Sequence, residues 1–328
     1  MNLGGPAFAL LSAASWGAGD FFGGLASRVG GLRSALVVTQ LFGVLVALCF
    51  VPFAAEPAPS AAGLGWAAAA GASGLLGIGC LYLALSGGTM MLVAPLTGLI
   101  AAVIPATVGI LGGDPVGPVL LLGMVVALVA VVLVALPDRP AGSPASRALR
   151  GTRAKEWLLI LGSGLGFAGF YLGVDMAHAA GSSTVFTLVG VRITSATLAV
   201  VLLSLPVLAG RPIGIHVSRR VLLLASLAAL GDTGGNALFI IANGLGSLSV
   251  TVVLASLYPV STAILARIVL HERLSRVQLA GVALAVAGAA LISAGSLGSC
   301  RCPGRMPGCR RPTRDGPRAS PGRCRRPP

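Results

Sequence analysis

Long runs of apolar residues, divided by short breaks of turn-forming or charged residues, fill almost the whole chain. A helix needs about 20 mostly apolar residues to cross the hydrocarbon core of a bilayer. Ten runs approach or exceed that length, at residues 6–26, 34–54, 64–85, 89–111, 117–136, 157–178, 184–208, 220–242, 246–269 and 277–297. The pattern therefore predicts ten transmembrane helices.

The spacing of the runs favours helices over strands. Within lipid, backbone N–H and C=O groups must bond to one another, which leaves helices and closed barrels. Barrel strands alternate polar and apolar residues, and these runs do not alternate. Most breaks are short, such as Ser86–Gly88, Gly112–Pro115 and Asn243–Gly244. We therefore expect an all-α integral membrane protein whose successive helices are antiparallel neighbours.

Composition supports lipid as the main solvent. The 328 residues are 55% hydrophobic and only 10% charged, whereas soluble domains carry about 25% charged residues. The mean hydropathy is +0.94. These values exclude a water-facing surface over most of the molecule and predict a multi-pass protein of the cell membrane.

The net charge of +14 arises from 23 basic and 9 acidic residues, and nine arginines lie within residues 301–328. Because the arginines do not cover a folded polar face, we expect no nucleic-acid partner. Most other arginines follow odd-numbered runs, which would place those loops in the cytoplasm. The basic tail favours the opposite orientation, so the side of the termini stays open.

Cysteine and histidine patterns offer no metal or cofactor site. Cys49 and Cys80 lie in apolar runs, and Cys300-Arg-Cys302 lacks the spacing of a zinc pair. The first apolar run lacks a basic leader, so we expect a retained helix and not a cleaved signal peptide. No nucleophile–base arrangement or phosphate-binding loop is present, and we therefore expect neither an enzyme nor direct ATP drive.

The two halves of the chain resemble each other. At an offset of 158 residues, acids, glycines and alanines coincide, as in the pairs Asp114 with Glu272, Gly123 with Gly281 and Gly77 with Gly235. Helices rich in Gly and Ala also align by chance, but the acid and glycine in matching loops favour a duplication. With five helices each, the halves would enter the membrane from opposite faces, as in many secondary transporters.

The expected organisation has four parts. Residues 1–136 form the first five-helix repeat and residues 157–297 form the second. Residues 137–156 form a basic connector rich in Pro, Gly and Ser, which we expect to be flexible. Residues 298–328 form a tail rich in Arg, Pro and Cys, which we expect to be disordered.

The stretch from Tyr258 to Ser293 resembles the EamA-type transporters of the drug/metabolite transporter superfamily. The residues that carry this resemblance are Pro259, Glu272, Gln278 and Gly281, with Asp114 and Gly123 as a weaker copy, Trp16-Gly17 in the first run and Arg192 in the seventh. Gln40 stands where the repeat would suggest an Arg. The resemblance implies two EamA-like repeats and solute transport, over substrates that range from amino acids to drugs and sugar derivatives.

Three ionisable residues within the runs are candidates for a central cavity, because charge inside a membrane usually faces a cavity or a partner. We expect Arg192 and Asp232 to line it, either as a structural ion pair or as ligands of a zwitterionic substrate. Asp20 could exchange a proton, or it could reach the membrane interface. Asp175 and Arg267 lie near the ends of their runs and are expected at the interface.

Uncharged polar and aromatic residues complete the candidate site. Trp16, Tyr82, Asn236 and Tyr258 could contact a substrate or serve only in packing. Trp66 and Trp157 begin their runs and are expected in the interfacial belt.

One motif in the sixth run matches a pattern that is typical of a different function. Gly164, Gly166 and Gly169 spell the dinucleotide-binding pattern GxGxxG. No strand precedes the pattern and it lies inside an expected membrane span, so we interpret it as close helix packing.

The sequence thus predicts a secondary transporter with a small-molecule substrate, working by alternating access in the lipid bilayer. The expected substrate is a metabolite, an amino acid-like compound or a drug, moved outward, with protons as one candidate coupling ion. The alternative is a lipid-handling protein, or an intramembrane scaffold or enzyme, that transports no solute.

Overall fold

The computed structural model describes residues 4–54, 59–86, 90–136, 154–208, 214–271 and 274–298, and all regular structure in these residues is helical. The helices are α1 (Gly4–Gly30), α2 (Leu32–Cys49), η1 (Val51–Phe53), α3 (Ala61–Ser86), α4 (Met90–Leu111), α5 (Pro118–Ala135), α7 (Ala154–Ala179), α8 (Thr184–Leu208), α9 (Arg219–Leu245), α10 (Leu248–Ala255), α11 (Tyr258–Val269) and α12 (Arg276–Gly298). Most of the expected connector and nearly all of the tail lie outside the described residues.

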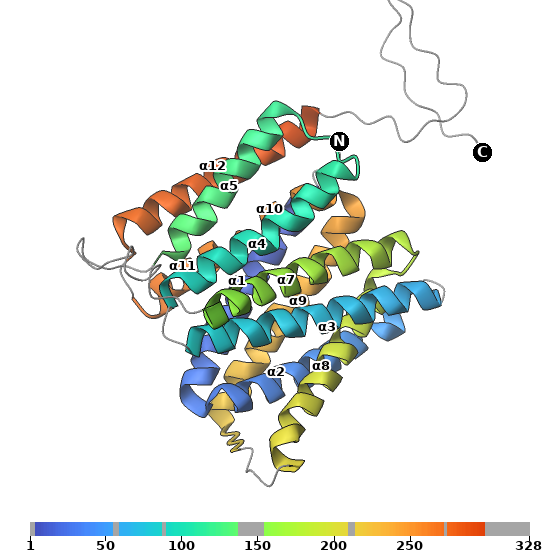
Figure 1. Cartoon of the computed structure of the whole chain (residues 1–328), viewed down its shortest axis with the longest axis vertical. Helices are drawn as coiled ribbons and strands as arrows, with labels where there is room; N and C mark the ends of the chain where they lie inside the picture. Colours follow the sequence, from blue (N-terminus) through green and yellow to red (C-terminus); the bar gives the residue numbers. More distant parts are fainter. Residues whose placement is uncertain are drawn as a thin grey trace, which may run out of the picture.

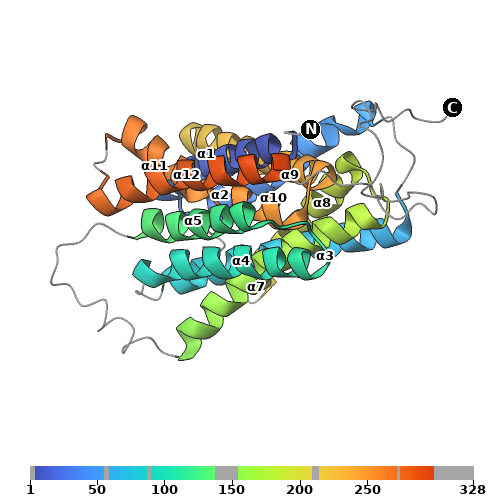
Figure 2. The ribbon, with the colours of Figure 1, turned by 90° about the horizontal axis from the view of Figure 1, so that it is seen from above.

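The long helices run roughly along one common direction and form an elongated bundle (Figure 1). Helices α5 and α12 lie side by side at one edge of the bundle, and α2 and α8 contact each other at the opposite edge (Figures 1 and 2). Helix α1 packs against α9, α10 and α11. The start of α1 and the end of α12 lie near each other (Figures 1 and 2).

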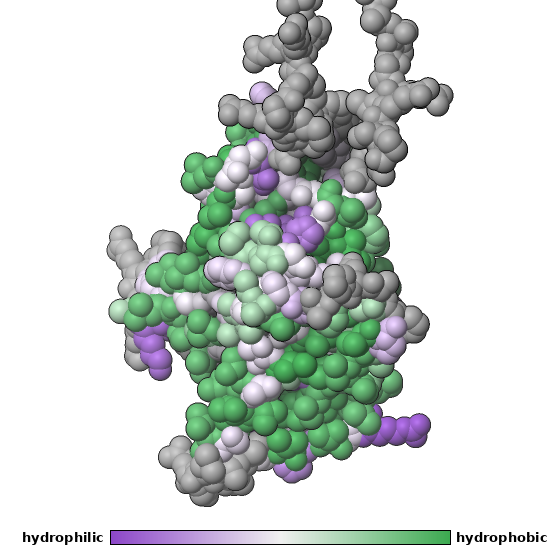
Figure 3. Space-filling view, turned by 90° about the vertical axis from the view of Figure 1, so that its right-hand side faces the viewer, coloured by the Kyte–Doolittle hydropathy of each residue, from purple (hydrophilic) through white to green (hydrophobic). Residues whose placement is uncertain are grey.

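The surface of the bundle suits a membrane. Eight helical segments are long and apolar enough to span one, and the apolar part of α4, Leu96–Leu111, is shorter. Helix α1 is long enough but less hydropathic. Hydrophobic residues dominate the coloured surface in Figure 3, and hydrophilic residues form only small patches. These features confirm an all-α, multi-pass membrane protein.

The ninth expected run, 246–269, corresponds to one apolar segment long enough to span a membrane, Leu248–Val269, but its helix is divided in two. Helix α10 ends at Ala255 and α11 begins at Tyr258, with Pro259 in its first turn. Proline lacks an N–H donor, and its ring collides with the carbonyl four residues earlier in a continuous helix. Pro259 therefore explains why the chain turns at Ser256 and Leu257 before the second helical segment starts.

Two other boundaries differ from the sequence prediction. Asn243-Gly244 was expected to end the eighth helix, yet α9 continues to Leu245. The Asn243 side chain donates a hydrogen bond to Asp175 of α7 at 3.0 Å, so a tertiary contact occupies the side chain that would otherwise form a turn. Helix α1 continues to Gly30, which places Asp20 farther from the helix end than predicted.

Glycines bring several helix pairs into close approach. A Cβ placed on Gly166 of α7 would lie 2.5 Å from the backbone N of Gly77 in α3, and one on Gly169 would lie 2.9 Å from the Ser73 hydroxyl. A Cβ on Gly164 would lie 2.6 Å from the Ile100 side chain of α4. The three glycines of the GxGxxG pattern are thus packing residues, as predicted.

Candidate functional site

An ion pair lies in the interior of the bundle. Arg192 of α8 donates from Nη1 to Oδ2 of Asp232 in α9, at 2.6 Å. The Arg192 side chain is only 3% exposed, whereas that of Asp232 is 38% exposed. Asp232 lies halfway along α9, about 20 Å from either end of the helix at 1.5 Å per residue.

The guanidinium of Arg192 uses only part of its hydrogen-bonding capacity. Its Nε and Nη2 atoms are buried and have no hydrogen-bond partner among the described residues, and the same holds for Thr233 Oγ1. A Cβ on Gly43 of α2 would lie 3.1 Å from Thr233 Oγ1 and 3.5 Å from Arg192 Nη1. Because Gly43 has no side chain, α2 leaves space for the Arg192 side chain at this point.

Asp20 stands beside this ion pair on α1. Ten helical residues follow it before α1 ends at Gly30, about 15 Å along the axis. Its side chain is exposed, yet it interacts electrostatically with Asp232 of α9, Tyr171 of α7 and Tyr258 of α11. The carboxylate thus lies among side chains of three other helices.

Close packing of α1 on α9 sets the spacing of the two carboxylates. A Cβ on Gly19 would lie 2.9 Å from the backbone N of Asp232, and one on Gly231 would lie 2.5 Å from the backbone N of Gly19. Ser15 donates from its hydroxyl to the Gly231 carbonyl at 2.7 Å. The residues that precede Asp20 and Asp232 therefore bring the two backbones together.

An aromatic cluster lies next to Asp20, formed by Trp16, Phe170, Tyr171 and Phe239. The Trp16 ring lies 5.7 Å from the Phe239 ring and 6.0 Å from the Tyr171 ring, measured between centroids. The indole Nε1 donates to Asn236 Oδ1 at 2.8 Å, which fixes the orientation of the ring. Trp16 is one helical turn before Asp20, so the two side chains share a face of α1.

The other residues predicted from sequence fall into different groups. Asn236 is buried and serves as the partner of Trp16. Tyr258 is half-buried at the start of α11 and packs against the apolar core. The side chain of Tyr82 lies outside the described part of the structure. The structure therefore brings together Trp16, Asp20, Asn236 and Asp232, with Arg192 bonded to Asp232.

Sequence reasoning missed the aromatic residues that surround the tryptophan. Phe170, Tyr171 and Phe239 are buried side chains within apolar runs, and nothing in their local pattern separates them from core residues. The adjacent pair Phe170-Tyr171 was the available signal, because a tyrosine in the middle of a membrane span needs a polar neighbour.

Other residues of the family resemblance occupy structural positions away from this group. Asp114, in the turn after α4, accepts a hydrogen bond from the backbone N–H of Ser249 at 2.9 Å and so caps the start of α10. Gln278 and Ser275 form a reciprocal capping box at the start of α12. Gln278 also donates to the Leu136 carbonyl at the end of α5. Glu272 lies outside the described residues.

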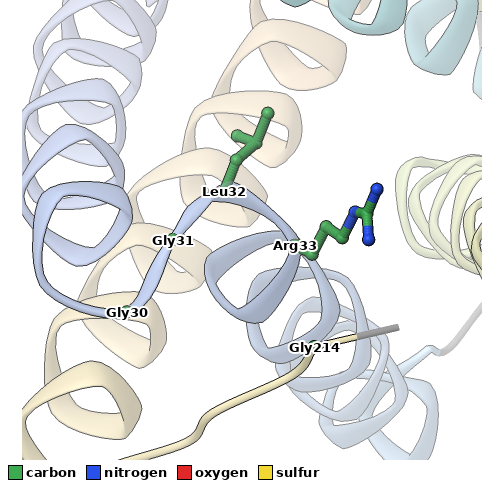
Figure 4. A pocket seen from close by; sticks show the side chains of 5 residues that line it. All are labelled: Gly30, Gly31, Leu32, Arg33 and Gly214. Carbon is green, nitrogen blue, oxygen red and sulfur yellow. The ribbon is translucent and has the colours of Figure 1, made fainter. Parts of the chain in front are cut away.

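Two further features lie near the ends of the helices. An open pocket lined by Gly30, Gly31, Leu32, Arg33 and Gly214 lies at the turn between α1 and α2 (Figure 4). Trp66 and Trp157 are exposed near the starts of α3 and α7. Over the described ranges, no three His, Cys, Asp or Glu side chains are grouped to hold a metal ion.

Comparisons with known proteins agree with this architecture. Residues 154–294 match the model of the EamA-like transporter family. No curated protein matches the chain. A solved crystal structure with 18% sequence identity matches it with a TM-score of 0.64, over 89% of this chain and 98% of the other. At that identity, the likeness concerns the fold alone.

Proposed function

From the match of residues 154–294 to the model of the EamA-like transporter family, we propose that this membrane protein is a secondary transporter in the cell membrane. It moves a small solute by alternating access between two halves. The observation that carries the proposal is the group of Asp20, Arg192 and Asp232 in the middle of the bundle. Placing ionisable side chains within a membrane costs free energy, and such residues usually face a solute pathway or pair with another group.

The proposed mechanism needs two inverted repeats, and a pair of hydrogen bonds supports them. Ser12 of α1 donates to the Gly235 carbonyl of α9 at 2.8 Å, and Ser163 of α7 donates to the Gly77 carbonyl of α3 at 2.8 Å. Gly77 and Gly235 are one of the pairs that the 158-residue offset predicts. The donors, Ser12 and Ser163, are 151 residues apart and so do not follow the same offset, but each lies on the helix that packs on its glycine partner, so a similar contact occurs twice with the roles of the halves exchanged.

The pairing of helices supports the same arrangement. In this scheme the first repeat holds α1 to α5, and the second holds α7 to α12 with α10 and α11 as one broken span. Helix α1 packs on α9 as α7 packs on α3, and α1 packs on α11 as α7 packs on α4. Helices α5 and α12 pair across the proposed symmetry axis. These correspondences support the proposed arrangement of ten spans in two five-helix repeats, 1–136 and 157–297, joined by the connector 137–156.

The proposed solute site lies where α1, α7, α8, α9 and α11 approach one another. Its lining is proposed to include Trp16, Asp20, Asp232, Asn236 and Tyr258, with Arg192 bonded to Asp232 behind it. Carboxylates and a guanidinium beside aromatic rings suit a small polar or amphipathic molecule, such as an amino acid-like metabolite or a drug. Export is the proposed direction, and proton exchange at Asp20 is the proposed form of coupling.

A lipid-handling role is the second candidate. It would use charged residues on a path open to lipid, and the basic turn with Arg33 and the pocket beside it (Figure 4) are the features that favour it. The ion pair of Arg192 and Asp232 lies inside the bundle and favours a soluble solute instead.

Flux through the purified protein in liposomes tests the proposal. Efflux and uptake of a panel of radiolabelled amino acids, amines and drugs are measured with and without a pH gradient. We expect protein-dependent flux of at least one solute, accelerated by the gradient. Asp20→Asn should abolish the acceleration, whereas Glu156→Gln, a matched change in the first turn of α7, should keep it.

Two results would contradict the proposal at different levels. No protein-dependent flux of any solute, together with transbilayer movement of labelled lipid, would favour the lipid-handling alternative. If the pH gradient accelerated solute flux equally in Asp20→Asn and in the unchanged protein, proton coupling through Asp20 would be contradicted.

A further inference from the structure

The charges at the centre of the bundle differ in how accessible they are. Arg192 is 3% exposed and one of its donors is bonded to Asp232, whereas Asp232 is 38% exposed. The remaining nitrogen donors of Arg192 are buried as well. Asp20 is exposed. The two carboxylates thus have exposed surface, whereas the guanidinium of Arg192 is covered.

Asp20 also differs from Asp232 in having no counter-charge. The carboxylate of Asp232 is neutralised by Arg192 at 2.6 Å. Among the described residues, no hydrogen bond or ion pair involves the Asp20 side chain, and its charged neighbour is another carboxylate. With two acids and one base in the group, Asp20 is the carboxyl group that has no basic partner among the described residues.

The side chains around Asp20 suit a cation with an apolar body. The tyrosines of α7 and α11 lie within electrostatic range of it, and Trp16 is one turn away on the same helix. The Trp16 ring packs with Tyr171, Phe170 and Phe239. Aromatic ring faces attract organic ammonium groups through their quadrupole, and the rings also bury the apolar part of such a molecule.

We propose that Asp20 and the aromatic cluster form a binding site for organic monocations, with amines or quaternary ammonium compounds as the substrate class. This inference rests on the proposed transport function and narrows it. The carboxylate of Asp20 provides the counter-charge, and the rings of Trp16 and Tyr171 contact the cation. A zwitterion or an anion binds less well, because the guanidinium that would receive its carboxylate is buried against Asp232.

Binding to purified protein in detergent tests the site without requiring transport. Trp66→Phe and Trp157→Phe leave Trp16 as the only tryptophan, since the chain has three. Fluorescence of Trp16 is then titrated with benzyltrimethylammonium, phenylalanine and phenylacetate, which share a ring and differ in charge. We expect the cation to bind at least ten-fold more tightly than the other two.

Variants separate a binding role of Asp20 from a structural one. Asp20→Asn should weaken binding of benzyltrimethylammonium at least ten-fold, and Asp20→Glu should restore most of it. Glu156→Gln makes the same chemical change about 22 Å away along α7 from Tyr171, at 1.5 Å per residue, and should leave binding unchanged. Size-exclusion chromatography and thermal unfolding of each variant exclude misfolded samples from the comparison.

The outcomes distinguish this inference from the function on which it rests. Equal or tighter binding of phenylalanine or phenylacetate, or cation binding unaffected by Asp20→Asn, would overturn the cation site even if liposomes show amino acid flux. Tight, Asp20-dependent cation binding would support the site even if no solute flux is found, in which case the transport proposal fails alone.

Discussion

At the scale of single residues, Arg192 and Asp232 illustrate what a buried ion pair costs. Removing one member of such a pair leaves an uncompensated charge, whereas replacing both by apolar residues is often neutral. The remaining donors of Arg192 already lack partners, so Asp232 is its principal compensation. The pair therefore couples α8 to α9 irrespective of any contact with solute.

We predict that Arg192→Met lowers the free energy of unfolding by about 3 kcal/mol, because Asp232 loses its counter-charge. The double variant Arg192→Met/Asp232→Leu should recover most of that loss. Thermal unfolding of the four proteins in one detergent gives the coupling between the two positions. Additive effects of the two substitutions would show that the ion pair contributes no coupling.

The sequence identified some of these residues for a physical reason and could not identify others. Charges in apolar runs stand out, so Asp20, Arg192 and Asp232 were evident before their contacts were known. Whether Arg192 and Asp232 would pair could not be decided, because partner choice depends on the packing of α8 on α9. Phe170, Tyr171 and Phe239 were missed, since aromatic residues are unremarkable in apolar runs.

At the scale of helices, small residues decide which pairs approach closely. The length of the apolar runs and their lack of alternation predicted the helices well, but the break before Pro259 needed the tertiary structure, as did the extension of α9 past Asn243. The contact of Gly19 with Gly231 is an example. A sequence pattern indicates that such glycines allow close packing, but only the structure shows which helices they bring together.

We predict that Gly231→Ala destabilises the protein by about 1–3 kcal/mol, as overpacking of a filled interface does. The added methyl would lie 2.5 Å from the backbone N of Gly19, so α1 and α9 must separate. Gly24→Ala is the control, because a Cβ there meets no atom within 4 Å and alanine favours helix. Equal melting temperatures for the two variants would contradict this account of the interface.

A second prediction at this scale concerns the cap of α10. Asp114→Ala should cost about 0.5–2 kcal/mol, because the N–H of Ser249 loses its acceptor. Asp114→Asn retains a side-chain oxygen and should cost less. Hydrogen exchange at Ser249 should accelerate in Asp114→Ala and stay slow in Asp114→Asn. Unchanged exchange in the alanine variant would mean that the carboxylate does not hold the helix start.

At the scale of the whole molecule, the proposed transport mechanism depends on two halves that enter the membrane from opposite faces. The offset of 158 residues suggested a duplication, and the exchanged contacts of Ser12 and Ser163 support it. Hydropathy alone could not settle this arrangement, because α1 is too polar to count among the eight apolar spans. The pairing of helices supports the repeat arrangement, which hydropathy does not address.

Labelling of one position at the end of α1 and one at the end of α7, which correspond in the proposed repeats, tests this arrangement most directly. Arg28 in the last turn of α1 and Ala179 in the last turn of α7 are both exposed. With the six native cysteines replaced by serine, Arg28→Cys and Ala179→Cys are treated in intact cells with a membrane-impermeant maleimide. We predict labelling of one position only, and of both after permeabilisation. Labelling of both positions in intact cells would contradict the inverted arrangement.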